Sequence, residues 1–338
     1  MTIIMLFLTQ KINKEKFLFC VNIYSNVKTL MNILLACVVM RVLDNKIHYP
    51  SIVIILLDLI WFVIISTFDS YLIFRRIKKL RQLDISNREY ILTYIKNTLI
   101  MSVIFLIIMQ LKYIIKDTED FVFIGICMIS TWIYQYVMPY VLKVTNKTDT
   151  TELTAIKDWL LDTCPIKSKY KIYSYEGKKS KSANAVVVGT SLNRHIFISD
   201  YFIENASQEE ILAILYHECG HIKNHDIEKR IIFLDIVMLL FFSLTCVMDY
   251  LKIGVMIGAI LLLVFVMGGL IIYKKMQQNQ ELRADKFSVS IIGDKKIYIE
   301  ALKRLYSMND MIKMNSKFFA LLSTHPQIQA RINNLDNI

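Results

Sequence analysis

The stretch His-Glu-Cys-Gly-His at residues 217–221 ends an apolar helical run that covers residues 211–216. In an α-helix, positions i and i+4 lie on one face, so the imidazoles of His217 and His221 can bind one metal ion. Glu218 lies beside that point and is placed to accept a proton from an attacking water instead of binding the metal. The simplest alternative is that this short motif arose by chance on an ordinary helix, so its context has to be tested.

The start of the same helix is also marked in the sequence. Ser207 precedes the apolar run and Glu210 follows three residues later, which is the pattern of a capping box. In such a box the serine caps the helix and the glutamate side chain reaches back to the backbone. We therefore predict a helix with a capped N-terminus at Ser207, which is a rigid platform for a metal site.

The composition is that of a helical membrane protein with a soluble portion. Of 338 residues, 55% are hydrophobic, and only nine are Gly and four Pro. The net charge of +11 could indicate nucleic-acid binding, but the basic residues cluster beside apolar segments, as cytoplasmic loops do. Six scattered cysteines show no paired spacing, which argues against a disulfide framework. Membrane topology therefore explains the charge better than nucleic acid does.

About six apolar segments are long enough to be considered as membrane spans. Four precede the motif and two follow it as a hairpin, at residues 29–43, 51–74, 95–115, 121–142, 231–248 and 253–273. Basic residues flank the second span and both ends of the hairpin, so we expect those ends, and the motif, on the cytoplasmic side. The predicted regions are an N-terminal membrane region at 1–143 and a second region at 144–338, interrupted by the hairpin at 231–273.

Short strands are predicted between the N-terminal region and the motif. Residues 170–175 alternate as a strand does, and residues 184–188 and 195–199 read as two further strands around a hairpin-like connection. The predicted fold is therefore mainly α, with a small β-sheet beside the helix that carries the motif.

A catalytic zinc site needs three protein ligands and one open position, so a third ligand has to be found. The choice lies between His225, four residues beyond His221, and Glu281, which follows the hairpin. His225 would have to bind from the next turn without the glycine that turns a third histidine inward in related sites. Glu281 has Asp285 at i+4, so one carboxylate can bind metal while the other orients a histidine or pairs with an arginine.

These residues resemble the zinc metallopeptidase family that includes the CaaX prenyl protease and the bacterial membrane protease HtpX. The likeness rests on the motif at 217–221, the hairpin, Glu281 with Asp285, Asn184-Ala185 upstream, and Thr324-His325-Pro326 followed by Arg331. It covers residues from about 150 to 335. The resemblance implies an α+β zinc-metallopeptidase domain of the HExxH type attached to the membrane helices.

The resemblance also implies a role for each matching residue. His217, His221 and Glu281 would bind one zinc ion per chain, and Glu218 would be the general base. Asp285 would support the site in contact with Arg331, and His325 would stabilise the tetrahedral intermediate. Asn184 and Ala185 would lie on an edge strand along which the substrate backbone docks. Where the family often has an aromatic residue after Asn-Ala, this chain has Val186, which changes the nearby subsite.

The expected function is that of an integral-membrane zinc endopeptidase of the cell membrane, multi-pass, with its catalytic domain on the cytoplasmic side. It would hydrolyse membrane-associated proteins or peptides, with the lipid bilayer as its other partner and no role for nucleic acid; the oligomeric state is not predicted. The alternative is a membrane sensor or scaffold whose metal site is structural or regulatory. A closed site with Cys219 or His225 as fourth ligand would favour that alternative.

Overall fold

The computed structural model describes residues 52–99, 120–145, 170–309 and 326–336, together with the single residues 17, 21, 153, 156 and 158. The chain divides into two compact units, Met1–Leu111 and Lys112–Ile338. Among the predicted features, the span at 29–43, most of the span at 95–115, and His325 lie outside the described residues.

In the first unit, helix α3 (Ile52–Arg81) contains residues 52–74 of the predicted span at 51–74. The helix does not end there: residues 75–81, which include the basic residues that flank the predicted span, add two more turns rich in lysine and arginine. Long basic side chains favour a helix as much as leucine does, so the change from apolar to basic sequence does not end it. The turn comes at Gln82, which has a positive φ of 52°, and residues 87–99 are again helical.

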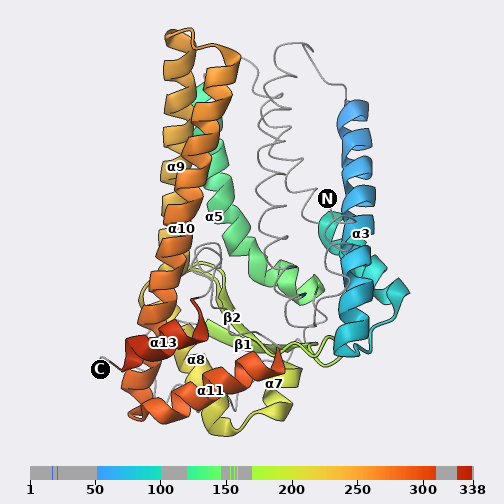
Figure 1. Cartoon of the computed structure of the whole chain (residues 1–338), viewed down its shortest axis with the longest axis vertical. Helices are drawn as coiled ribbons and strands as arrows, with labels where there is room; N and C mark the ends of the chain where they lie inside the picture. Colours follow the sequence, from blue (N-terminus) through green and yellow to red (C-terminus); the bar gives the residue numbers. More distant parts are fainter. Residues whose placement is uncertain are drawn as a thin grey trace. The chain divides into compact units, whose positions relative to one another are not determined.

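The second unit contains a small sheet, a set of helices packed on it and a long helical hairpin (Figure 1). In chain order its elements are α5 (Asp120–Thr145), β1 (Tyr170–Tyr175), β2 (Ala185–Val188), β3 (Arg194–Ser199), α7 (Asp200–Asn205), α8 (Gln208–Lys223), α9 (Asp226–Tyr250), α10 (Val255–Ile292), α11 (Lys295–Met308) and α13 (Ile328–Leu335). The apolar core lies between the sheet, α8 and α11, and includes Ile172, Ile196, Leu215, Tyr298 and Leu302.

The three predicted strands form one sheet in the order β1-β3-β2. Strands β2 and β3 pair antiparallel, which confirms the hairpin-like connection, whereas β1 pairs parallel to β3. Every residue of β3 is buried, because β3 is the central strand and is covered on both faces. Strand β2 is therefore an outer strand of this sheet, next to the helix that carries the motif.

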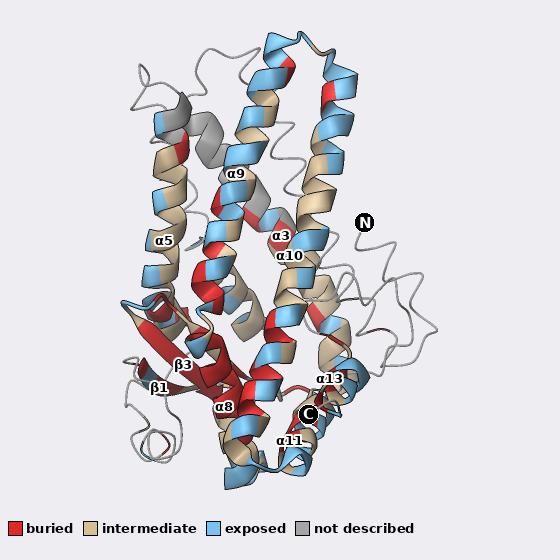
Figure 2. Cartoon of the chain, turned by 90° about the vertical axis from the view of Figure 1, so that its left-hand side faces the viewer, coloured by how far each residue is buried: buried red, intermediate tan, exposed pale blue. Residues whose placement is uncertain are grey.

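Helices α9 and α10 form the predicted hairpin, but both extend beyond the apolar segments. Each is long and apolar enough to cross a membrane, and they are the two such helices among the described residues. Only 17% and 6% of their most apolar windows are buried, so most of the hairpin is exposed or partly exposed (Figure 2). Because α10 continues without a break from the second span to Ile292, Glu281 and Asp285 lie on the same helix as that span. The other four spans stay predictions.

Helix α5 lies against α9 through a buried acid. Asp235 of α9 accepts hydrogen bonds from Thr131 Oγ1 and from the Trp132 indole, each at 3.1 Å. An acid in an apolar helix needs such partners, because an unpaired buried carboxylate is costly. This contact joins α5 to the hairpin.

Candidate metal centre

Helix α8 carries His217, Glu218 and His221, and it begins as predicted. Ser207 caps the helix, its hydroxyl accepts from the Glu210 backbone, and the Glu210 carboxylate accepts from the Ser207 backbone. This capping box is confirmed by the structure. From Ala213 to Ile222 every residue of the helix is buried, so the motif lies on a helix enclosed by its neighbours.

Helix α10 packs closely on α8 at two small residues. A side-chain carbon added at Gly220 would lie 2.9 Å from the Ala284 backbone, so only glycine allows this approach. One turn further along α10, Ser288 donates to the Ala213 carbonyl of α8 at 2.7 Å. The close contact brings Glu281, one turn before Ala284, against the histidine pair.

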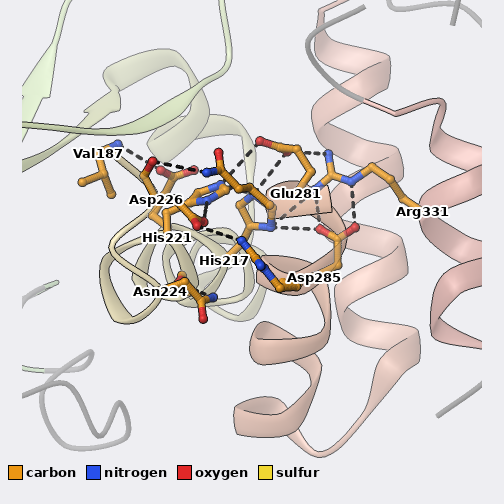
Figure 3. Close-up of polar contacts among 12 residues, drawn as sticks. Val187, His217, His221, Asn224, Asp226, Glu281, Asp285 and Arg331 are labelled. Carbon is orange, nitrogen blue, oxygen red and sulfur yellow. Dashed lines mark hydrogen bonds and ion pairs between the residues drawn. The ribbon is translucent and has the colours of Figure 1, made fainter. Parts of the chain in front are cut away.

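The three predicted ligands converge at one point (Figure 3). Their ligand atoms all lie within 4.8 Å of one another. The Nε2 atoms of His217 and His221 are 3.2 Å apart, and the two Glu281 oxygens lie 3.5 Å and 3.4 Å from them, respectively. In a tetrahedral zinc site with bonds of about 2.0–2.1 Å, ligand atoms are separated by about 3.3–3.4 Å. Two imidazole nitrogens and one carboxylate therefore fit a zinc ion in both chemistry and spacing.

The far side of the His217 ring is held by a buried network. Its Nδ1 lies 2.9 Å from Asp285 Oδ1, and the Tyr298 hydroxyl, 3.1 Å from the same nitrogen, donates to Asp285. Arg331 donates to both oxygens of Asp285 and to the Tyr298 oxygen. A bond from Nδ1–H to the carboxylate leaves the lone pair of Nε2 directed at the metal position. The predicted contact of Asp285 with Arg331 is present.

His221 is held in the same way by Asp226, which was not among the predicted site residues. Asp226 Oδ2 lies 2.8 Å from His221 Nδ1, and its other oxygen accepts from Arg283 at 3.1 Å. Asp226 is fully buried in the first turn of α9. His225, in the left-handed conformation with φ of 52°, turns the chain so that Asp226 points back at the ring. The signal in the sequence was a carboxylate just past the motif, because a histidine ligand usually needs an acceptor for its second nitrogen.

The carboxylates around the two histidines favour the protonated, positively charged form of the imidazole rings. Burial alone would lower the pKa of His221, but Asp226 and Glu281 outweigh burial and raise that pKa to about 10. His217 behaves in the same way: burial opposes the charge, and Asp285 with Glu281 raises its pKa above the ordinary value. The site therefore stabilises a cation at the point where the ring nitrogens meet.

Glu218 lies between the histidine pair and the sheet. Its side chain is buried, and its Oε2 accepts the backbone N–H of Val187 in β2 at 2.9 Å. Burial raises the pKa of Glu218, which makes its carboxylate a better proton acceptor than an exposed one. Val187 lies on the side of the histidines opposite to Arg331 (Figure 3). The hydrogen bond fixes the carboxylate next to the outer strand.

The remaining predicted residues fall into two groups. Asn184 is exposed just before β2, and Ala185 begins that strand, so both lie at the predicted edge. Within the described ranges, the cluster of possible metal ligands consists of His217, His221 and Glu281. Neither Cys219 nor His225 belongs to it. The fourth protein ligand that a closed structural site requires is therefore not supplied by either of them.

Comparison with known proteins gives one family match, two similar relatives and one similar structure. The model of Peptidase family M48 matches residues 147–338. A Protease HtpX homolog of Chlorobium luteolum is 26% identical over 214 residues, which cover 54% of this chain and 72% of the relative. Another, of Variovorax paradoxus, is 24% identical over 187 residues, covering 48% of this chain and 63% of the relative. The crystal structure of S. mikatae Ste24p is similar in fold, with a TM-score of 0.57 and 18% identity, over 99% of this chain and 79% of that one.

Proposed function

Because the chain belongs to peptidase family M48, it is a metalloendopeptidase, and we propose that it hydrolyses membrane-associated proteins or peptides with one zinc ion. The observation that carries the proposal is the meeting of His217, His221 and Glu281 at the spacing of a tetrahedral site. The test is zinc analysis of the detergent-solubilised protein together with cleavage of casein. Casein left intact by the zinc-loaded protein would contradict the proposal.

Bound zinc would polarise the peptide carbonyl and make a water molecule more acidic, toward a pKa of about 7. Glu218 takes the proton of the attacking water and then passes it to the leaving amine. The Val187 N–H keeps the Glu218 carboxylate in place. We assign His325 to the developing oxyanion, where a positioned donor lowers the barrier.

The substrate backbone is proposed to dock along β2. Strand β2 is an outer strand of the sheet, and its Val187 N–H already binds the proposed general base. A peptide that docks along this edge beside Asn184 and Ala185 would therefore have a peptide bond close to Glu218. Val186 pairs with Phe197 on the face of the sheet that carries Tyr173, so the nearby subsite is shaped by aliphatic and aromatic groups.

We propose that the protein is an integral, multi-pass protein of the cell membrane, with residues 1–143 as a membrane region and residues 144–338 as the peptidase region. The apolar and largely exposed surfaces of α9 and α10 support lipid contact. Basic residues at 229–230 and at 274–275 support a cytoplasmic position for the metal centre.

This orientation predicts the outcome of a glycosylation experiment. The sequons at 146–148 and 205–207 should stay unmodified when the chain is translated with microsomes, because both lie on the cytoplasmic side. As a control, a sequon in a flexible spacer inserted after Lys252, in the turn between α9 and α10, should acquire glycan. The reverse pattern would show that the orientation is inverted.

Asp226→Asn is expected to weaken zinc binding by about 10-fold to 100-fold, because the neutral amide no longer polarises His221. The measurement is competition for zinc with a chromophoric chelator. Asp249→Asn, an exposed acid at the other end of α9, is the matched control and should leave the affinity unchanged. An unchanged affinity in Asp226→Asn would show that the contact with His221 does not support the metal.

A further inference from the structure

The outer strand β2 exposes backbone groups in an alternating order. The Asn184 carbonyl accepts the Ser199 N–H at 2.9 Å, so Asn184 turns its backbone toward the neighbouring β3. Because successive residues of a strand point in opposite directions, the even-numbered residues from 184 to 188 face β3 and the odd-numbered ones from 183 to 187 face outward. A docking peptide can pair only with the outward set.

Of the three outward residues, Ala183 has both of its backbone groups paired and Val187 has its N–H paired. The Val187 N–H donates to Glu218 at 2.9 Å, as described above. At the other end, the Ala183 N–H donates to Asn309 Oδ1 at 3.0 Å, and Asn309 Nδ2 donates to the Ala183 carbonyl at 2.6 Å. Between them, no described residue pairs with the outward groups of Ala185.

Asn309 therefore occupies the position that the backbone of a neighbouring strand would take. Its side-chain amide presents an acceptor oxygen and a donor nitrogen side by side, and these bond the N–H and the carbonyl of Ala183, respectively. A further hydrogen bond fixes the Asn309 side chain, because its Nδ2 also donates to the Leu305 carbonyl in the last turn of α11, at 3.0 Å. The last turn of α11 thus covers the edge at a defined residue.

We propose that Asn309 ends the docking edge, so that an extended substrate pairs its backbone with β2 no further toward Ala183 than Ala185. This inference rests on the proposed docking of substrate along β2. Natural sheet edges are often covered in this way to stop unwanted strand addition. Here Asn309 would also set specificity, because substrate residues beyond Ala185 in the direction of Ala183 are not held through their backbone.

The consequence is a limit on the length of peptide that the enzyme recognises. Residues that extend past Ala185 toward Ala183 gain no backbone hydrogen bonds, so lengthening a substrate in that direction should not improve binding. Such a site suits a cleavage position in a short exposed segment, such as a loop or a chain end beside the membrane, better than one within a long extended stretch.

The experiment compares the wild type with Asn309→Ala on two series of quenched fluorescent peptides, each extended one residue at a time on one side of the scissile bond. In Asn309→Ala the freed groups of Ala183 should lower the KM of long peptides in one series by about 3-fold to 10-fold, with little change in kcat. Peptides too short to reach Ala183 should keep their wild-type values. Asn205→Ala is the matched control, because Asn205 also bonds the carbonyl four residues before it, that of Tyr201, at the end of α7.

Hydrogen exchange at the Ala183 amide gives a second readout that does not depend on turnover. In the wild type this amide should be protected whether or not peptide is present, and in Asn309→Ala it should be protected only when a long peptide is bound. Equal changes at all lengths, or no change, in a folded and zinc-loaded Asn309→Ala protein would overturn the inference alone. Failure of the wild type to cleave any peptide would overturn the proposed function and this inference with it.

Discussion

Glu218→Gln is expected to bind zinc as tightly as the wild type and to lose about 100-fold to 10,000-fold in kcat. Glutamine has the size of glutamate and can still accept the Val187 N–H, so the local geometry is retained. It cannot take a proton from water, because a neutral amide is not a base. The change therefore removes the proton transfer and little else.

The measurement is steady-state hydrolysis of a quenched fluorescent peptide, with zinc content and thermal unfolding recorded on the same samples. Glu209→Gln is the matched control, because Glu209 lies in the first turn of the same helix and is exposed. It should keep full activity and zinc content. If Glu218→Gln hydrolysed peptide at the wild-type rate, another group would have to be the base.

The parts of the site that could be predicted from the sequence are those set by local periodicity. His217 and His221 share a face because an α-helix repeats every 3.6 residues, and the capping box at Ser207 is a contact over three residues. Glu281 and Asp285 were placed on one helix by the same rule, and they remain on it because α10 has no break. In each case the contact depends on a helix that the sequence specifies strongly.

The parts that could not be predicted depend on how elements pack. Tyr298 reaches His217 from α11, 81 positions away along the chain, and nothing near Tyr298 in the sequence marks it as part of a metal centre. The parallel pairing of β1 with β3 depends on a crossover, so it has no turn signal between adjacent strands. Asp226 was close to the motif, but its role required the left-handed turn at His225.

Glycine 220 shows how one residue joins the local pattern to the packing. The HExxH motif does not specify the residue at this position, because a residue here is neither a metal ligand nor the general base. In the fold it is the point where α10 crosses α8, with the Ala284 backbone within 2.9 Å of an added side-chain carbon. A larger residue would push α10 away and move the Glu281 carboxylate from the two ring nitrogens, which lie 3.4 Å and 3.5 Å from it.

Glu281→Ala is expected to lower the affinity for zinc by more than about 100-fold, which is the upper range for losing a residue that only supports a ligand. Two histidines from one helix would then hold the ion with two open positions in place of one. Hydrolysis should fall to the background rate at zinc concentrations that saturate the wild type. The measurement is zinc competition with a chelator, followed by peptide hydrolysis over a range of added zinc.

Glu300→Ala is the control for this change, because Glu300 is an exposed acid on the next helix, α11. It should affect neither zinc affinity nor hydrolysis. If Glu281→Ala kept the wild-type affinity, the third ligand would have to come from elsewhere, and His225 would be the first residue to examine. The combined result separates metal binding from proton transfer, because Glu218→Gln keeps the zinc and loses the reaction, whereas Glu281→Ala loses both.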